Sequence, residues 1–156
     1  MNNEEFGKRI ENIRLRLYKT ALLYLGSEAV ALDAVDEAVY KALCSYKKLR
    51  QPEYFDTWIT RILINECYNE LRRQKRFRPL DELPEGATEE FDTLPLKEAI
   101  RRLPRELKEV VILRYFAGYT LIETADTLQI PQGTVATRQR KALKLLKMEL
   151  SEEVGE

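Results

Sequence analysis

The chain of 156 residues is long enough for one or two small domains, and its 26 basic and 26 acidic side chains give a formal net charge of zero. That balance argues against indiscriminate coating of nucleic acid, and the lack of an 18-residue apolar run or signal-peptide pattern predicts a soluble, cytoplasmic protein without membrane contact of its own. Histidine, glycine-rich phosphate loops and nucleophile motifs are all absent, so we expect no catalytic residue, metal or cofactor.

The first part of the chain predicts three amphipathic helices, which we expect to form one domain at 1–78. The first helix, at 5–25, has apolar residues at spacings of three and four: Ile10, Ile13, Leu17, Ala21 and Leu25. Gly26 is expected to end this helix, and Ser27 can cap the next one.

A second helix is expected at about 28–48. Its predicted buried face consists of Leu32, Val35, Val39, Leu43 and Tyr46. Its opposite face is mostly acidic and consists of Asp33, Asp36, Glu37 and Lys41. On the residues alone, the acidic face is best interpreted as a solvated surface.

A third helix is expected at about 56–76. Its apolar stripe consists of Ile59, Ile62, Leu63, Cys67 and Leu71. Its polar side consists of Arg61, Asn65, Tyr68 and Arg72, at spacings of four, three and four. Cys67 and Cys44 lie in separate predicted helices without CxxC spacing, so we expect two buried, reduced thiols rather than a disulfide or a metal site.

Residues 79–95 are expected to form a flexible acidic linker. This segment has three prolines, six acidic residues and no basic residue, and it follows a basic run at 72–78. It contains too little apolar surface to offset the entropy of ordering itself. The sequence therefore predicts an all-α protein in which two small helical domains are joined by this linker.

The second domain, at 96–156, is expected to contain a helix to Arg102, a break at Leu103-Pro104, a helix at 105–116 and a helix-turn-helix. Thr120 and Glu123 have the spacing of a reciprocal helix cap. Pro131 interrupts the helical periodicity, because proline inside a helix removes a hydrogen bond.

The last helix resumes at Gly133 and has no acidic residue as far as Met148. Its predicted inward stripe consists of Val135, Ala142, Leu145 and Leu146, and its other faces carry Thr137, Arg138, Arg140, Lys141 and Lys144. A short turn followed by a basic helix is the pattern of a major-groove reader. An ordinary packed helix pair with a solvated basic face would look similar.

Four segments together resemble the extracytoplasmic-function sigma factors, the small two-domain group of bacterial RNA polymerase sigma subunits. In the first domain these are ALDAVDEAVYKAL at 31–43 and FDTWITRILINECYNELRR at 55–73. In the second they are AIRRLPRELKEVVILRYFAGYT at 99–120 and IPQGTVATRQRKALKLLK at 130–147. The resemblance implies a protein that binds core RNA polymerase and directs promoter recognition and transcription initiation, in the family commonly as part of a stress response.

The resemblance also implies partners and site residues. Docking on the β′ clamp helices of polymerase would use Asp33, Asp36 and Glu37; the β flap, promoter DNA and an anti-sigma factor are further implied partners. Contact with the −10 element would use Arg61, Asn65, Tyr68, Arg72 and Arg73, with a base pocket at 51–55. Contact with the −35 element would use Gln132, Thr134, Thr137, Arg138, Arg140, Lys141 and Lys144.

The chain departs from the family pattern at a few positions. Asp36 stands where a glutamine is usual, and Asn69 where an aspartate is usual. Thr124 and Thr127 replace apolar residues, and Gln129 replaces a turn glycine, at a cost of about 1 kcal/mol if it is left-handed. We expect these changes to affect which promoter sequence the protein recognises and how stable its second domain is.

Other functions remain open on sequence grounds. A stand-alone helix-turn-helix regulator that binds DNA as a dimer explains the second domain but leaves the first without a role. A degenerate relative that only binds a protein partner would not need basic residues on both presumed DNA surfaces. An enzyme is the least favoured alternative.

Overall fold

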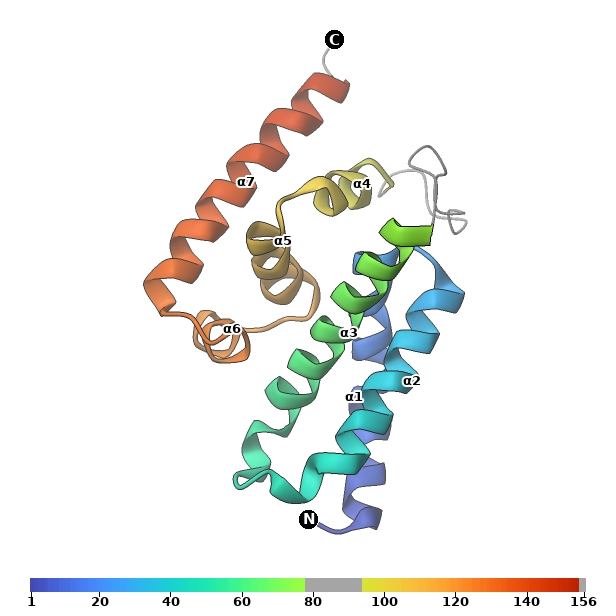
Figure 1. Cartoon of the computed structure of the whole chain (residues 1–156). Helices are drawn as coiled ribbons and strands as arrows, with labels where there is room; N and C mark the ends of the chain where they lie inside the picture. Colours follow the sequence, from blue (N-terminus) through green and yellow to red (C-terminus); the bar gives the residue numbers. More distant parts are fainter. Residues whose placement is uncertain (78–93, 155–156) are drawn as a thin grey trace. The chain divides into compact units, whose positions relative to one another are not determined.

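The protein is described by a computed structural model at residues 1–77 and 94–154, and every regular element in those two ranges is helical (Figure 1). The chain divides into two compact units. The first contains α1 (Asn3–Leu25), α2 (Glu28–Ser45) and α3 (Phe55–Phe77), with 3-10 turns at Tyr46–Lys48 and Pro52–Tyr54. The second contains α4 (Leu94–Arg102), α5 (Arg105–Val111), a π turn (Ile112–Phe116), α6 (Leu121–Leu128) and α7 (Gln132–Val154). The expected all-helical, two-domain fold is confirmed.

Helix α1 follows the predicted pattern closely. Its predicted stripe of five apolar residues is buried. The Asn2 side chain accepts a hydrogen bond from the backbone N–H of Glu5 at 2.8 Å, which satisfies one of the unpaired donors at the start of the helix. The helix ends at Gly26, whose φ of 75° is left-handed, and Ser27 caps α2 as expected.

The predicted buried face of helix α2 is confirmed only in part: Val35 and Tyr46 are buried, Val39 is half-buried, and the two leucines are not buried. Leu32 and Leu43 are 47% and 48% exposed, whereas the buried face is formed by Ala31, Ala34, Val35, Ala38 and Ala42. The alanines have the same helical spacing as the leucines. Because α2 packs against both α1 and α3, small side chains allow the helix axes to approach closely on the crowded side. The larger leucines therefore lie at the surface.

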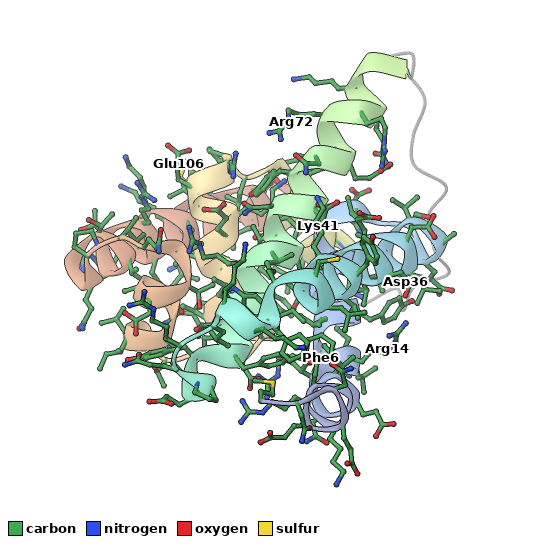
Figure 2. The ribbon with its side chains drawn as sticks, turned by 60° about the horizontal axis from the view of Figure 1, so that its bottom comes forward. Phe6, Arg14, Asp36, Lys41, Arg72 and Glu106 are labelled. Carbon is green, nitrogen blue, oxygen red and sulfur yellow. The ribbon has the colours of Figure 1, made fainter. Side chains whose placement is uncertain are left out.

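An aromatic cluster closes the end of the first unit at which α1 begins. The ring of Phe6 stacks on Tyr46 at 4.7 Å between centroids and meets Phe55 edge-on at 5.8 Å (Figure 2). Arg9 places its guanidinium over the Phe55 ring and donates to the backbone oxygen of Pro52 at 2.6 Å. These contacts fix the loop between α2 and α3 against α1.

In the second unit, α5 ends in a π turn that the sequence did not predict. The N–H of Ala117 donates to the oxygen of Ile112 at 2.9 Å, five residues earlier, in place of the usual four. The break at Leu103-Pro104 is confirmed, since α4 ends at Arg102 and α5 begins at Arg105.

The helix-turn-helix consists of α6 and α7. Thr120 and Glu123 form the expected capping box. The backbone N–H of Glu123 donates to the Thr120 hydroxyl oxygen at 3.1 Å, and the backbone N–H of Thr120 donates to the Glu123 carboxylate at 2.9 Å. Gln129 follows α6 with φ 58° and ψ 48°, so the residue that replaces the turn glycine is left-handed. A small core of Val110, Ala125 and Val135 joins α5, α6 and α7.

Val135, Ala142 and Leu146 are buried as predicted, but Leu145 is 40% exposed because it lies at the edge of the stripe, beside Pro104. Thr124 and Thr127 are both buried, and Thr127 satisfies its hydroxyl by donating to the Glu123 oxygen at 2.8 Å. The expected linker at 79–95 lies outside the described residues apart from its last two, which begin α4.

No helix in the described ranges combines the length and the apolar character that a membrane span requires.

Candidate nucleic-acid interface and docking surface

The acidic face of α2 is exposed, as expected, but its three carboxylates are not equivalent. Asp36 forms an ion pair with Arg14 of α1 at 2.7 Å (Figure 2). Asp33 and Glu37 form no ion pair with any described residue, and they line a groove between α2 and α3. They are therefore the members of the predicted docking set that are available to a basic partner.

This groove has a volume of about 430 Å³ and a net negative lining. Its charged residues are Asp33, Glu37, Lys41, Glu66, Glu70 and Arg73. Lys41 pairs with Glu66 across the groove and Arg73 pairs with Glu70 on α3. Four carboxylates thus face two cations, so the groove favours a cationic partner.

The polar side of α3 contains part of the predicted −10 set. Arg61, Asn65 and Arg72 are exposed, and Arg72 donates a hydrogen bond to Asn69 three residues earlier on α3. Tyr68 does not belong to this surface: it is only 7% exposed, and its ring meets Tyr24 edge-on at 5.3 Å. Arg73 lies at the groove, because its pair with Glu70 turns it toward α2.

The loop at 51–55, where a base pocket is expected, exposes only one of its two aromatic residues. Phe55 is 1% exposed and belongs to the core, whereas Tyr54 is 47% exposed. Because Arg9 holds the Pro52 backbone, Tyr54 is displayed from a fixed turn. An exposed aromatic ring next to a basic helix is a surface on which an unpaired base can stack.

The predicted −35 residues lie on two sides of α7. Thr134, Thr137, Arg138 and Lys141 line a groove of about 850 Å³ that α7 forms with Pro104, Glu106 and Leu107 at the start of α5. Gln132, Arg140 and Lys144 are exposed and lie outside this groove. Arg138 and Arg140, two of the predicted contacts to the −35 element, therefore face different directions.

Glu109 of α5 is a residue that the sequence analysis missed. Burial raises the pKa of its carboxyl, although its hydrogen bond with Arg105 and the nearby Arg138 guanidinium oppose that rise in pKa. The Arg105 Nε to Glu109 Oε1 distance is 3.2 Å. Arg138 thus has a carboxylate near its guanidinium that can orient it.

A hydrogen-bonded bridge joins the π turn to α7. The Nε of Arg114 donates to Gln139 Oε1 at 2.9 Å, and its Nη1 donates to the backbone oxygen of Tyr119 at 2.8 Å. The Nε2 of Gln139 donates to the Tyr115 hydroxyl oxygen at 3.0 Å. These bonds hold α7 in a fixed orientation relative to the segment before α6.

Within the described part of the chain, no cluster of three or more cysteine or acidic side chains is arranged to hold a metal ion. Cys67 is buried, as predicted, but the prediction for Cys44 is wrong, since this thiol is exposed on α2. Both cysteines are free thiols.

Comparison with known proteins assigns the two units to two parts of one family. Residues 10–77 match Sigma-70 region 2, and residues 99–148 match Sigma-70 region 4. The chain is 35% identical over 141 residues to the RNA polymerase sigma factor SigV of Bacillus subtilis, covering 87% of this chain and 85% of SigV. It is 30% identical over 132 residues to the ECF RNA polymerase sigma factor SigM of Mycobacterium tuberculosis, covering 81% of this chain and 67% of SigM.

The chain belongs to the ECF sigma factors. Two solved structures share the fold of this sigma factor. They are RpoE in complex with the anti-sigma factor NepR from Bartonella quintana, with a TM-score of 0.78, and CnrH in complex with the cytosolic domain of CnrY, with a TM-score of 0.77. RpoE is 20% identical in sequence to this chain, and the match covers 98% of this chain and 99% of RpoE. CnrH is 21% identical, and the match covers 97% of this chain and 90% of CnrH.

Proposed function

We propose that this sigma factor binds core RNA polymerase, directs it to promoters and opens the DNA by capturing unpaired bases. The observation that carries the proposal is the presence, in one chain, of an acidic groove and of two separate basic helix surfaces. The groove lies between α2 and α3, and the basic surfaces lie on α3 and α7. A stand-alone regulator needs only the last of these.

Docking on the β′ clamp helices is assigned to Asp33 and Glu37. Both carboxylates are exposed at the groove edge and lack an intramolecular ion pair among the described residues. Asp36 contributes after exchange of its exposed pair with Arg14, which costs little because such surface pairs are worth about 0–1 kcal/mol. Polymerase therefore meets a surface of negative charge.

Contact with the −10 element is assigned to Arg61, Asn65 and Arg72, which share the exposed side of α3. Stacking on a base that has left the duplex is assigned to Tyr54, because its ring is exposed beside the start of α3. One stacked base contributes about 1–3 kcal/mol, so capture of a few bases stabilises an open duplex without ATP.

Contact with the −35 element is assigned to α7 in the major groove. Arg138 and Arg140 are the candidates for bidentate recognition of guanine, worth about 1–3 kcal/mol against a wrong base. Backbone N–H groups near Gln132 can hold a phosphate. If about four phosphates are neutralised, the logarithm of the binding constant should fall with the logarithm of the salt concentration with a slope of roughly −3.6. This modest dependence suits a protein whose two domains bind together, each raising the effective concentration of the other.

An anti-sigma factor is proposed as a regulatory partner. The two solved structures of similar fold are both complexes: one is of the sigma factor RpoE with the anti-sigma factor NepR, and the other is of CnrH with the cytosolic domain of CnrY. Leu32 and Leu43 are exposed on α2, so such a partner could contact these apolar side chains as well as the acidic face.

The test is copurification with purified bacterial core polymerase. Asp33→Lys with Glu37→Lys is expected to abolish binding, while helical content and the melting temperature remain unchanged. Glu11→Lys with Glu28→Lys makes the same change in charge at exposed positions of α1 and α2 and should leave binding intact. Retention of the first variant by core polymerase would contradict the docking assignment. Specific binding of the isolated protein to a palindrome would favour the stand-alone regulator instead.

A further inference from the structure

The direction of the hydrogen bonds around Gln139 can be derived from the chemistry of its neighbours. The Nε of Arg114 can only donate, so the amide oxygen of Gln139 must be the atom that faces it at 2.9 Å. The amide nitrogen then faces Tyr115 and donates to the hydroxyl oxygen at 3.0 Å. The phenol oxygen is therefore an acceptor in this bridge.

The hydroxyl hydrogen of Tyr115 is not used by this bridge. A phenol can accept and donate at the same time, and no described residue accepts a hydrogen bond from the Tyr115 hydroxyl. The side chain is 49% exposed, so its O–H is directed toward solvent. Gln139 thus selects the orientation in which the tyrosine donates outward.

The place of this donor relative to α7 follows from helix geometry. Gln139 lies seven residues, or about two turns, after Gln132, so both residues lie on the same side of the helix. Arg140 is its immediate neighbour and is exposed. The Tyr115 hydroxyl therefore lies beside the basic helix that would enter the groove, with the Arg114 cation one residue away.

We propose that Tyr115 donates a hydrogen bond to a DNA backbone phosphate beside the −35 element, with Gln139 and Arg114 as the residues that position it. This inference rests on the proposed function of α7. A contact with phosphate fixes the register of the protein on the duplex and carries no base information. Since tyrosine is neutral, the contact adds affinity without releasing a further counterion.

The first test uses the complete holoenzyme and Tyr115→Phe, which keeps the ring and removes only the hydroxyl. Affinity is measured on a promoter with its matched −35 element and on one with a single substitution there, over a range of salt. We expect a loss of about three- to tenfold on both promoters, the magnitude of one typical hydrogen bond formed in competition with water. The discrimination ratio, the salt slope and the melting temperature should not change.

The outcomes separate this inference from the function on which it rests. If the unmodified holoenzyme does not prefer the matched promoter, the proposed function of α7 is wrong. If it does prefer that promoter and Tyr115→Phe binds both promoters as tightly as the unmodified protein, only the phosphate contact is wrong. A loss of discrimination would also overturn the inference, because it would place Tyr115 at a base.

A double-mutant cycle with Gln139→Glu tests the positioning role. The carboxylate still accepts from Arg114, but it also accepts from the Tyr115 O–H, which turns that hydrogen inward and away from DNA. Its added charge weakens binding in any background. The loss should therefore be about three- to tenfold larger with tyrosine at 115 than with phenylalanine. Equal losses in the two backgrounds would show that Gln139 does not direct Tyr115.

Discussion

Arg14 and Asp36 form an ion pair between α1 and α2, with 2.7 Å between Nη2 and Oδ1. Their side chains are 48% and 63% exposed, so water and salt screen the interaction. The pair neutralises one of the three carboxylates on the expected docking face. Under the proposed docking, Arg14 would compete with polymerase for Asp36.

Arg14→Ala should consequently strengthen binding to core polymerase. We expect about a twofold increase at low salt, which disappears at high salt because the freed charge is screened. Unfolding free energy should change by less than about 0.5 kcal/mol. Arg16→Ala removes the same charge from an exposed position of α1 and is the matched control. An equal increase for both variants in a salt-dependent binding titration would indicate a net-charge effect and contradict the competition.

The two thiols should differ strongly in reactivity. Burial raises the pKa of the Cys67 thiol to about 12, followed by smaller effects of Glu66 and Glu70, so little thiolate exists near neutral pH. Cys44 is exposed. A thiol-reactive dye should label Cys44 rapidly and Cys67 only when the protein unfolds. Cys44→Ser should therefore remove the rapid phase. Two rapid phases in the folded protein would contradict the assigned burial.

Gln129→Gly should stabilise the second unit. A left-handed non-glycine residue costs about 1–2 kcal/mol, part of which glycine returns as greater entropy of the unfolded chain. We expect a net gain of about 0.5 kcal/mol by thermal or denaturant unfolding. Gly118→Ala, at φ 77°, provides the opposite change and should destabilise. A lower stability for Gln129→Gly would show that the glutamine side chain contributes more than its strain costs.

Lys108 carries a charge at a buried position of α5. Burial lowers the pKa of its amine, and the nearby Arg101 lowers it further, against a smaller opposite effect of Glu109. A lowered pKa in the folded state means that the protonated lysine costs stability below its ordinary pKa, and this cost fades as the pH rises toward about 10.5.

Lys108→Met should therefore raise the melting temperature at pH 7, by about 4–8 °C for each kcal/mol recovered. The advantage should shrink on titration toward pH 10. Lys147→Met, at an exposed position of α7, should have little effect at either pH. A melting temperature that falls at pH 7 would show that the buried amine is stabilised by a contact that outweighs its desolvation.

Local rules explain most of what the sequence predicted correctly. The stripe of α1, the Thr120–Glu123 cap and the break at Leu103-Pro104 depend on neighbours within four residues, so they can be read from short segments. Gln129 was identified as a strained turn residue for the same reason. These are also the features on which the helix-turn-helix depends.

Features that depend on packing between helices were less predictable. Leu32 was expected to be buried because it lies on the predicted apolar stripe, but close packing on both sides of α2 favours the alanines. Tyr68 has the spacing of an exposed residue, yet Tyr24 of α1 provides a ring against which it packs. The bridge from Arg114 to Gln139 spans 25 residues and depends on a π turn. No local sequence pattern predicted that turn.

Transcription in vitro tests the central claim most directly. Purified core polymerase, a library of linear promoters and this protein would be combined, with the transcripts sequenced to identify their templates. The account predicts initiation from a small set of promoters that share elements near −35 and −10, and its loss when the protein is omitted or carries Asp33→Lys with Glu37→Lys. Absence of any transcript that depends on the protein, in a reaction where a known sigma factor is active, would contradict it.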